Sequence, residues 1–344
     1  MRRLPRACKL HEGQQGLCFV RMRRDDQIVL TTYGRSSGFC VDPIKKKPLN
    51  HFLPGSAVLS FGTAGCNLAC RFCQNWDISK SREIDTLADA AGPEDLARAA
   101  VALGCRSVAF TYNDPVIFME YAVDVAQACS EVGVKAVAVT AGYIRPEPRV
   151  EFYRHMDAAN VDLKGFTEDF YRRICAGRLQ PVLETLEYLK HETRVWFEIT
   201  NLQIPGANDT DAEIDAMTGW MVEHLGPDVP MHFTAFHPRL EDARPSPDPA
   251  GHPDQGSRDS HREWGPPRLH RQRPRRGGRQ HLVPCLWPAA DRAGQGYQLG
   301  AWNLTEDGCC RHCGTRCAGR FEGPPEGWGP HRLPVVLHQP HPQR

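Results

Sequence analysis

The sequence predicts an α/β protein whose main domain is a partial (β/α)6 TIM-like barrel. Short apolar strands and amphipathic helices alternate repeatedly between Ala57 and Pro238. Alternation of β-branched strands with helices is typical of parallel strands covered by helices. The alternating region has roughly 180 residues, which is short of the about 250 residues of a complete eight-unit barrel. Because barrels place their chemistry at the carboxyl ends of the strands, functional residues are expected there.

Six strands and five helices are expected in this region. The strands are Ala57–Gly62, Ser107–Thr111, Lys135–Thr140, Ala158–Leu163, Arg194–Thr200 and Met231–Phe236. The helices between them are Pro93–Leu103, Val116–Val132, Pro146–His155, Leu179–His191 and Asp211–Leu225.

Small appendages that contain cysteines flank the barrel. We divide the chain into an N-terminal cysteine-containing extension (1–50), the barrel (51–238), a segment without periodicity (239–296), and a C-terminal remnant of a metal-knuckle domain with a tail (297–344).

The composition favours a cytoplasmic metalloprotein. The chain of 344 residues has 14 cysteines and a net charge of +1. It has no secretory apolar segment and no apolar run long enough to span a bilayer, which argues against a membrane partner. Grouped cysteines without export indicate metal binding in a reducing compartment rather than disulfides. The near-zero charge gives no argument for nucleic acid. Cys105, Cys129 and Cys175 stand alone and are interpreted as ordinary buried residues.

Three cysteines in eight residues are the most informative motif of the chain. Cys66, Cys70 and Cys73 have the spacing Cys-x3-Cys-x2-Cys and directly follow a predicted strand. Three thiolates cannot close a tetrahedral zinc site, but they suit a [4Fe–4S] cluster with one iron open to a chelating ligand such as S-adenosylmethionine (SAM). Phe72 offers an aromatic face against which adenine could pack. The alternatives are a chance grouping or half of a zinc ribbon, both of which leave the preceding strand unexplained.

Polar residues follow the later strands, where a cofactor rim would lie. They are Asn113 and Asp114 after the second strand, Thr140 after the third, Asp162 and Lys164 after the fourth, and Glu198, Pro205 and Gly206 in and after the fifth. Any one of them could simply cap a loop. Their succession behind the cysteine loop favours a shared site.

These motifs together resemble a known family. The cysteine loop is similar to the radical SAM signature, so the barrel resembles the radical SAM type. Thr111–Pro115 (TYNDP), Asp162–Gly165 (DLKG) and Ile204–Asp209 (IPGAND) resemble the branch that contains the pyruvate formate-lyase activating enzymes. The resemblance is closer to the radical SAM enzyme of the AmmeMemoRadiSam system. It covers about Cys8–Pro238 and resumes at Tyr297–Gly329.

The resemblance implies a role for each of the polar residues. The cluster would be held by Cys66, Cys70 and Cys73, and SAM would bind beside it. Asn113 and Asp114 would contact the methionyl amine, although many activating enzymes have Glu at the Asp114 position. Asp162 and Lys164, our candidate catalytic residues, would form a polar pair near the methionyl carboxylate and the substrate. The candidate cofactor-binding residues are Phe72, Asn113, Asp114, Thr140, Glu198, Pro205 and Gly206, with Ile204–Gly206 flanking adenine.

The implied reaction is reductive cleavage of SAM at the cluster. It would give methionine and a 5′-deoxyadenosyl radical that abstracts hydrogen from a substrate, a small molecule or a protein, which the sequence does not identify. An electron donor such as flavodoxin or ferredoxin, and other proteins of the AmmeMemoRadiSam system, would be partners. The alternatives are an activating enzyme that acts on a protein glycine, and an iron–sulfur electron-transfer protein that never cleaves SAM.

The two ends of the chain each carry an incomplete cysteine motif. Cys310-x2-Cys313-Gly is one knuckle, which is half of a zinc-ribbon or rubredoxin-like site. An intact knuckle domain would hold a second metal, zinc or iron, at Cys310 and Cys313. At the N-terminus, Cys8 and Cys18 are fewer cysteines than the family tends to have there, so the chain is expected to begin late.

Arg239–Ala293 has a composition unlike the rest of the chain. It lacks Lys, Ile, Phe, Tyr, Met, Asn and Thr, while Arg and Pro are frequent. One interpretation is a disordered linker. The other is a compensated frameshift, because Arg279–Asp291 can be back-translated so that the shifted frame reads Thr-Trp-Cys-Pro-Ala-Cys-Gly, the missing knuckle. This hypothesis places the shift between about Arg239 and Tyr297.

Overall fold

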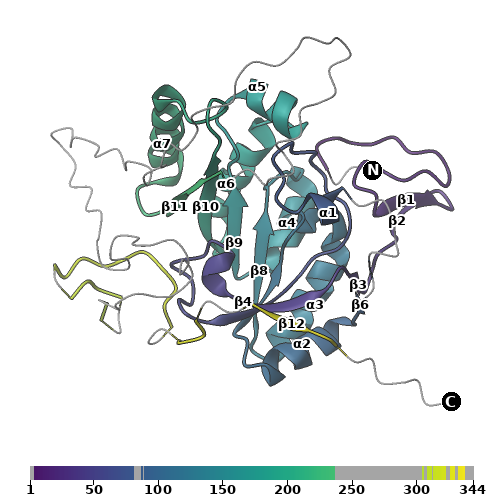
Figure 1. Cartoon of the computed structure of the whole chain (residues 1–344), viewed down its shortest axis with the longest axis horizontal. Coiled ribbons are helices and arrows are strands. Elements are labelled where there is room, and N and C mark those ends of the chain that lie inside the picture. The colour runs from purple at the N-terminus through teal and green to yellow at the C-terminus, as the bar shows by residue number, and fades with distance from the viewer. Residues whose placement is uncertain are drawn as a thin grey trace, which may run out of the picture.

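The computed structural model describes most of the predicted barrel and parts of both appendages (Figure 1). It describes residues 4–80, 87, 89–236, 304–305, 308–311, 313–322, 326–329 and 332–337. The segment 239–296, with its linker and frameshift interpretations, lies outside the described residues, as do His237 and Pro238. The division into four regions therefore stays a prediction.

An eight-stranded sheet forms the centre of the protein, in the order β11-β10-β9-β8-β7-β5-β4-β12. Its strands are β4 (Phe39–Pro43), β5 (Ala57–Phe61), β7 (Ser107–Phe110), β8 (Lys135–Thr140), β9 (Ala158–Asp162), β10 (Trp196–Gln203), β11 (Met231–Ala235) and β12 (Leu333–Val335). The strands from β5 to β11 pair in parallel, whereas β4 pairs antiparallel with β5 and β12 with β4. The α/β partial barrel is confirmed, and β4 and β12 extend it at the β5 edge.

Helices follow the strands as the sequence predicts, but one expected helix is divided in two and one strand extends further than expected. The longer helices are α2 (Pro93–Ala102), α3 (Met119–Glu131), α4 (Pro146–Arg154), α6 (Gln180–Glu192) and α7 (Asp211–Leu225). Shorter elements are α1 (Trp76–Ser79), α5 (Glu168–Phe170), η1 (Ile44–Lys46), η3 (Pro115–Phe118), the π-helix η4 (Tyr171–Cys175), and strands β1 (Arg21–Arg24), β2 (Gln27–Leu30), β3 (Arg35–Ser36) and β6 (Asp89–Ala90).

The first difference divides the helix expected at Val116–Val132. Pro115 begins the separate 3-10 turn η3, and Phe118, with φ −120° and ψ 34°, interrupts the helix before α3 starts. The second difference lengthens β10 to Gln203, because its parallel partner β11 continues the ladder to the pair Gln203–Ala235.

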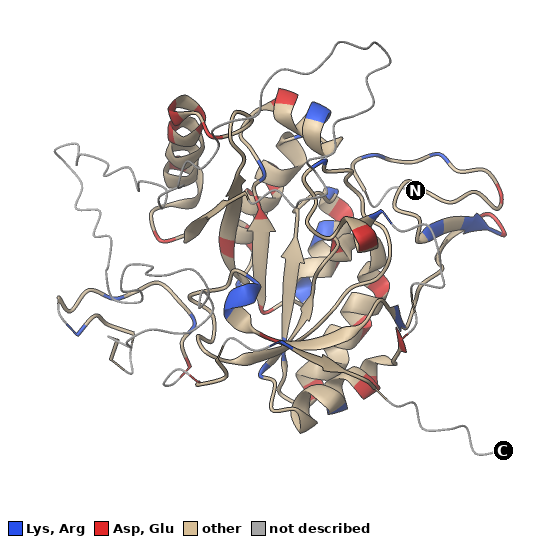
Figure 2. Cartoon of the chain, in the orientation of Figure 1, with Lys and Arg blue, Asp and Glu red and all other residues tan. Residues whose placement is uncertain are grey.

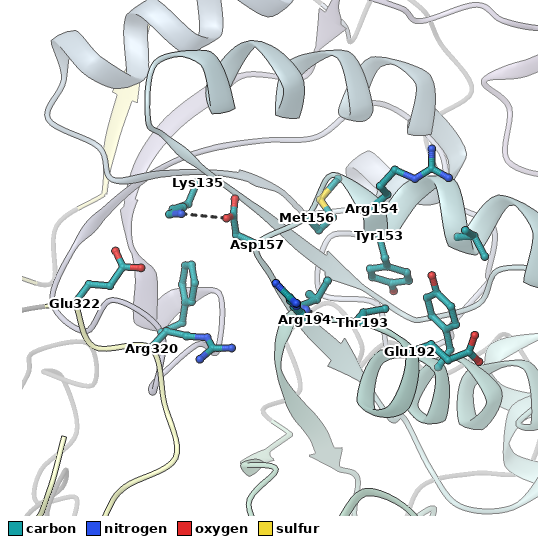
Figure 3. Close-up of a pocket in the computed structure, with 14 residues that line it drawn as sticks. Lys135, Tyr153, Arg154, Met156, Asp157, Glu192, Thr193, Arg194, Arg320 and Glu322 are labelled. Atoms are coloured by element: carbon teal, nitrogen blue, oxygen red, sulfur yellow. Dashed lines mark hydrogen bonds and ion pairs between the residues drawn. The ribbon is translucent and has the colours of Figure 1, made fainter. Parts of the chain in front are cut away.

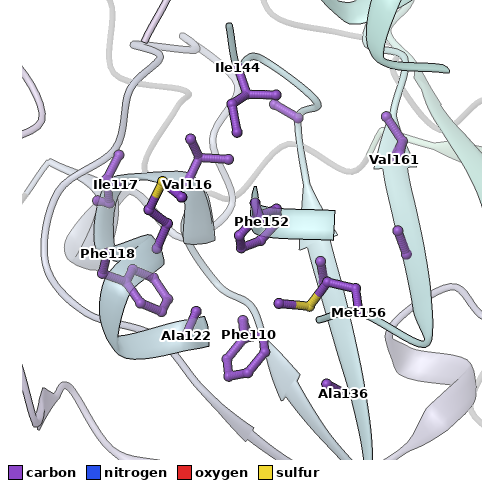
Figure 4. Close-up of a cluster of buried hydrophobic side chains, with 14 of the residues drawn as sticks. Phe110, Val116, Ile117, Phe118, Ala122, Ala136, Ile144, Phe152, Met156 and Val161 are labelled. Atoms are coloured by element: carbon purple, nitrogen blue, oxygen red, sulfur yellow. The ribbon is translucent and has the colours of Figure 1, made fainter. Parts of the chain in front are cut away.

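The outer face of the sheet carries the main core. Phe110 of β7, Phe118 of η3 and Phe152 of α4 lie together there with Met156 (Figure 4). The Phe61 ring of β5 meets the Phe110 ring edge-on, with 5.6 Å between the ring centroids. Aromatic and aliphatic burial of this extent is the dominant stabilising contribution in a domain of this size.

A smaller apolar cluster fills the inner face near the amino ends of the strands. Ile44, Leu49, Phe52 and Leu53, from the segment before β5, pack there against Val58, Ala109, Val137 and Ala158 of four strands. Farther along the strands the buried inner residues become polar, and they include Ser60, Asn160, Glu198 and Thr200. Because the apolar cluster fills the amino end of the barrel, space for a ligand is expected toward the carboxyl ends of the strands.

The described surface carries charges of both signs over the helices that cover the sheet (Figure 2). Within the part of the chain that the structure describes, no helix combines the length and the apolar character needed to cross a bilayer.

Candidate metal and cofactor site

The cysteine triplet lies on the loop that leaves the carboxyl end of β5. The loop begins at Gly62, where an added Cβ would meet the Thr111 carbonyl oxygen at 2.3 Å and Asn113 Oδ1 at 2.8 Å. Only glycine allows this close approach to the tip of β7. The loop is therefore held directly against the TYNDP motif.

Asn113 anchors this loop through its side-chain amide. Its Nδ2 donates to the carbonyl oxygens of Thr63 and Gly65, each at 2.8 Å, and its Oδ1 accepts from the Thr63 N–H at 3.3 Å. All three contacts are buried. Asn113 was predicted to contact the methionyl amine, and that contact stays a prediction; the structure gives it a positioning role.

The three thiols of the triplet have different neighbours. The Cys66 thiol lies 3.6 Å from Asn67 Oδ1, and the Cys73 sulfur lies 3.1 Å from the Ser79 hydroxyl. The Cys70 thiol is buried, and burial together with the neighbouring Cys175 raises its pKa. None of the described cysteines is in a disulfide, and among the described residues no three ligating side chains meet at one point.

The segment Ile174–Gly177 packs along the far side of the loop. The Ala69 N–H donates to the Cys175 carbonyl oxygen and the Arg71 N–H donates to the Ile174 carbonyl oxygen, both at 3.0 Å. Cys175 is buried, as the sequence predicts, and its backbone carbonyl oxygen is one of the two that hold the triplet loop. Sequence separation concealed this contact, because η4 and the loop are about a hundred residues apart.

Asp114 is buried and caps η3. Its Oδ1 accepts from the Val116 N–H at 3.2 Å and from the Thr140 hydroxyl at 2.9 Å, and its Oδ2 accepts from the Ala141 N–H at 3.4 Å. Burial raises the pKa of this carboxyl, and the hydrogen bonds from Thr140 and Val116 offset part of the rise. Asp114 and Thr140, predicted as cofactor-binding residues, are thus brought together by the carboxyl ends of β7 and β8.

Asp162 and Lys164 form the predicted pair. Lys164 Nζ lies 2.8 Å from Asp162 Oδ2 and 5.9 Å from the centroid of the Phe72 ring. Burial alone would lower the pKa of Lys164, but Asp162 and the neighbouring Cys70 raise it well above its ordinary value. The side chain of Lys164 therefore stays protonated and positively charged beside the triplet.

Glu198 is fully buried and binds the segment before β5. Its carboxylate accepts from the N–H groups of Asn50 and His51 at 2.9 and 2.8 Å, from Trp196 Nε1 at 3.0 Å, and contacts His232 Nε2 at 2.6 Å. Burial opposes its ionisation, yet His232 and these donors hold the pKa of Glu198 below its usual value. These protein contacts engage both oxygens, and a role for Glu198 at the cofactor stays a prediction.

The loop with Pro205 and Gly206 is tied to the Lys164 backbone by Asn208. Asn208 Nδ2 donates to the carbonyl oxygens of Lys164 and Leu202 at 2.7 and 2.8 Å, and its Oδ1 accepts from the Ile204 N–H at 2.7 Å. Gly206 itself is exposed. The loop therefore lies beside the charged pair, as an adenine-flanking loop would have to.

The donors and acceptors present fit a [4Fe–4S] cluster and SAM. The three thiols of the triplet lie on one loop, and none of them is in a disulfide. Thr63 Oγ1, on that loop, and Asn160 Oδ1, on the inner face of β9, are buried without a hydrogen-bond partner among the described residues. Since buried polar atoms are nearly always paired, a polar ligand would satisfy them. Sequence reasoning had not selected either residue, and no sequence signal distinguishes them from ordinary core polar residues.

A cavity of about 420 Å³ lies at the opposite, amino end of β8–β10 (Figure 3). Its rim includes the ion pair of Lys135 with Asp157, in which the two charged atoms are 3.2 Å apart, and the side chains of Arg154 and Arg194. None of the residues predicted for the site is among its described lining. The triplet loop and this cavity are thus separated by the length of the strands.

The C-terminal knuckle docks at the amino end of the barrel. Its turn is closed by a 2.8 Å hydrogen bond from the Gly314 N–H to the Cys310 carbonyl oxygen. Cys310 and Cys317 are buried, and Cys313 is exposed. The Cys317 sulfur lies 3.9 Å from Nδ1 of His51, which belongs to the segment that fills the amino end of the barrel.

Comparisons with known proteins found similar sequences and structures. The chain is 36% identical to an uncharacterized protein of Methanocaldococcus jannaschii over 71% of this chain and 72% of that protein. Among solved structures, Streptococcus suis SuiB has a TM-score of 0.43 and 16% identity, covering 57% of this chain and 43% of SuiB, less than two thirds of its length. A domain of the pyruvate-formate lyase-activating enzyme from Bacteroides vulgatus has a TM-score of 0.32 and 20% identity, covering 37% of this chain and 74% of that domain. The radical SAM superfamily pattern matches residues 61–218, from the end of β5 to α7. Together with its relative, this match shows that the chain belongs to the radical SAM superfamily.

Proposed function

We propose that this chain is a radical SAM enzyme in which Cys66, Cys70 and Cys73 hold a [4Fe–4S] cluster and SAM binds beside it. The observation that supports the proposal best is the position of Lys164, whose Nζ is paired with Asp162 and lies 5.9 Å from the ring of Phe72, a residue of the triplet loop. When bound, the cluster would supply the electron that cleaves SAM into methionine and a 5′-deoxyadenosyl radical.

The charged pair would bind the amino-acid end of SAM. Lys164 Nζ can attract a methionyl carboxylate as a point charge, and Asp162 keeps this ammonium oriented. The Phe72 ring closes the same side of the space, because it lies within cation–π reach of Lys164 and 6.0 Å from the Phe170 ring. These side chains would orient SAM and exclude water from it.

Asn113, Asp114 and Thr140 would act behind the residues that contact SAM, by holding the surrounding backbone in place. Asn113 fixes the triplet loop, and Asp114 fixes the start of η3 and the end of β8. The SAM ammonium that the resemblance places on Asp114 would bind Oδ2, which accepts a long 3.4 Å hydrogen bond from the Ala141 N–H, or would share Oδ1 with the Thr140 hydroxyl. Orientation of the reacting groups by such fixed supports is a large part of what proteins contribute to cofactor chemistry.

Anaerobic turnover tests this proposal. The protein is purified without oxygen, its iron and sulfide are measured, and SAM with dithionite is added while 5′-deoxyadenosine is followed by liquid chromatography and mass spectrometry. We expect a 5′-deoxyadenosine signal in the wild type and none in Cys70→Ala. A full cluster with no SAM cleavage would instead identify an iron–sulfur electron-transfer protein.

Substrate and partners are separate proposals. An electron donor of the flavodoxin or ferredoxin type, and companion proteins of the AmmeMemoRadiSam system, would follow from the sequence resemblance. A protein glycine as substrate, as for an activating enzyme, would follow from the similarity of the TYNDP and DLKG motifs. We also infer a reducing compartment, because grouped reduced cysteines persist there.

A second metal at the knuckle is a further part of the proposal. Cys310 and Cys313 are spaced as zinc ligands, and Cys317, which follows them in the chain, lies 3.9 Å from Nδ1 of His51. Zinc and iron analysis of the protein and of Cys313→Ser tests it. We expect metal above the cluster iron in the wild type, and equal metal in both proteins would contradict it.

A further inference from the structure

Three cations surround the buried carboxylate of Asp42, a residue of β4. Lys46 Nζ lies 2.9 Å from Oδ1, Lys47 Nζ lies 2.7 Å from Oδ2, and Arg332 Nε lies 3.9 Å from Oδ1. One carboxylate against three cations leaves an excess of two positive charges within this group. A single ammonium group is enough to neutralise a buried carboxylate, so neutralising Asp42 does not explain the other two cations.

This charged group lies on the inner face of the sheet, below the tip of β7. Asp42 pairs in register with Val58, whose side chain belongs to the apolar cluster of the inner face. The Tyr112 hydroxyl donates to Asp42 Oδ2 at 2.8 Å, and Lys47 Nζ lies 4.7 Å from the centre of the Tyr112 ring. Tyr112 precedes Asn113, which holds the triplet loop. One tyrosine side chain therefore spans from these cations to the strand tip that holds the cysteine loop.

Lys47 is buried but keeps unused hydrogen-bond donors. Its side chain is 2% exposed, and an ammonium group has three N–H donors. Within the part of the chain that the structure describes, its Nζ makes one hydrogen bond, to Asp42 Oδ2. Burial lowers the pKa of Lys47 to about 8 against the opposing effect of Asp42. A further anion beside this ammonium group would offset the cost of its burial.

A buried acceptor lies next to these donors. Asn160 Nδ2 donates to the carbonyl oxygen of Pro48, the residue after Lys47, at 3.1 Å, so the Asn160 amide contacts the segment that carries the cations. Asn160 Oδ1 has no hydrogen-bond partner among the described residues, although a buried carbonyl oxygen is nearly always paired. The site thus offers an acceptor as well as cations.

The inner face is open to solvent at the level of Asn160. Val139 of β8 pairs in register with Asn160 and faces the same side as Val137, two residues earlier. Val137 is fully buried, whereas Val139 is only partly buried although β8 has a strand on each side. A ligand can therefore approach Asn160 from the carboxyl ends of the strands.

We propose that the inner face between Asp42 and Asn160 binds a small organic anion, a carboxylate or phosphate that also carries a hydroxyl or amino group, and that this anion is the substrate. Lys46 and Lys47 would bind its charged oxygens, since ammonium groups attract either kind of anion as point charges. Its hydroxyl or amino group would donate to Asn160 Oδ1. A small molecule is favoured over a protein glycine, because a peptide backbone has no net charge to match the cations. Binding of the anion depends on this chain alone, whereas its role as substrate rests on the proposed function.

Calorimetry on the metal-free full chain tests the binding step. The probes are L-malate and glycerol 3-phosphate, which combine an anionic group with a hydroxyl, and the controls are glycerol, which has no charge, and succinate, which lacks the hydroxyl. We expect at least one probe to bind with a Kd of about 1 mM, as is usual for ligands of so few atoms, and glycerol not to bind. The tighter probe identifies the preferred anionic group. Absence of binding by both probes, or binding of succinate as tight as that of L-malate, overturns the proposal.

Lys46→Met shows where the anion binds. Lys46 is 28% exposed, and its replacement leaves the buried pair of Lys47 with Asp42 in place. We expect the affinity for the tighter probe to fall about tenfold in Lys46→Met and to recover in Lys46→Arg, which restores the charge. Should Lys46→Met not fold, Lys46→Gln, which can still donate to Asp42, takes its place. The matched control is Lys135→Met, since Lys135 also pairs with an aspartate, at the amino end of β8. Equal affinity in the Lys46 variant and the wild type, or an equal loss in Lys135→Met, contradicts the site.

The two proposals fail in distinguishable ways. If the anion binds as expected but the loaded protein forms no 5′-deoxyadenosine, the anion site stands and the radical SAM reaction is wrong. If 5′-deoxyadenosine forms and neither probe binds, the reaction stands and the substrate class is wrong. Binding that is lost in Lys164→Met and kept in Lys46→Met would place the anion at the proposed SAM site and overturn the inference.

Discussion

The side-chain amide of Asn113 donates to the carbonyl oxygen of Gly65 over 2.8 Å. This hydrogen bond joins the tip of β7 to the loop that carries the cysteine triplet, immediately before its first cysteine. The neighbouring contact with Thr63 makes the anchor bidentate. Cluster ligands and barrel are thus connected through one buried side chain.

Asn113→Ala should therefore impair the loop more than the fold. Removing the amide leaves buried backbone groups of Thr63 and Gly65 unpaired, at a cost of about 1–3 kcal/mol in the free energy of unfolding. We expect less iron per chain after reconstitution. The matched control is Asn208→Ala, since Asn208 also bridges two carbonyls and one N–H but holds the loop after β10. Equal iron loss in both variants would argue against the anchor.

Lys164→Met should weaken SAM binding while leaving the iron content unchanged. Loss of a charge-assisted hydrogen bond to the methionyl carboxylate should cost about 1.5–3 kcal/mol, measured by calorimetry on the reconstituted protein. Lys135→Met is the matched control, because Lys135 also pairs with an aspartate, at the opposite end of the strands. If both variants bind SAM as the wild type does, Lys164 does not contact the cofactor.

Asp114→Asn should flatten the dependence of stability on pH. Burial raises the pKa of Asp114 above 3.8, so the folded chain holds this proton more tightly than the unfolded chain. The free energy of unfolding that the carboxyl contributes is therefore present at low pH and is lost as pH rises above 3.8 through the folded pKa. Denaturant unfolding of both proteins from pH 4 to 7 (a range of about three units) measures the difference. A constant difference across this range would contradict the raised pKa.

Asp42→Asn should be strongly destabilising because it leaves the buried ammonium group of Lys47 without its carboxylate partner. Lys47 is 2% exposed, and its Nζ lies 2.7 Å from Asp42 Oδ2. Removing one partner of a buried ion pair costs about 3–5 kcal/mol. Chemical denaturation at neutral pH measures it, with Asp157→Asn in the half-exposed pair with Lys135 as the control, for which about 0–1 kcal/mol is expected.

The same carboxyl should also contribute to acid unfolding. Burial opposes ionisation of Asp42, but Lys47, Lys46 and Tyr112 outweigh it and lower its pKa from 3.8 to about 2. A depressed pKa gives stability that is present above 3.8 and is lost as pH falls toward 2. Between these values the wild type should lose stability faster than Asp42→Asn, and parallel curves would contradict the assignment.

Local pattern was enough to predict the repeating part of the fold. Alternating apolar strands and amphipathic helices predicted the six parallel strands, because each β–α unit is encoded within about thirty residues. The pattern also located the triplet at a strand end, since Ala57–Phe61 is buried throughout. Strand β12 was missed because its three residues pair with β4 across nearly the whole chain.

Side-chain direction at the site could not be predicted from sequence. Asn113 was selected for its type and place, but whether its amide faces a ligand or the Gly65 carbonyl depends on the path of another loop. Cys175 was set aside because nothing in its own neighbourhood indicates that η4 packs on the triplet. Contacts between distant segments are a product of the assembled tertiary structure, which periodicity does not encode.

The pairing of β12 with β4 has a consequence for the order in which the chain matures. β4 precedes the barrel strands, whereas Leu333–Val335 are synthesised after all of them. Until those residues leave the ribosome, one border of the nascent sheet presents unpaired backbone groups that can recruit a strand from another chain. A chain shortened before Leu333 would keep that border open permanently. We therefore expect such shortened chains to need chaperone protection during synthesis and to aggregate at concentrations where the full chain does not.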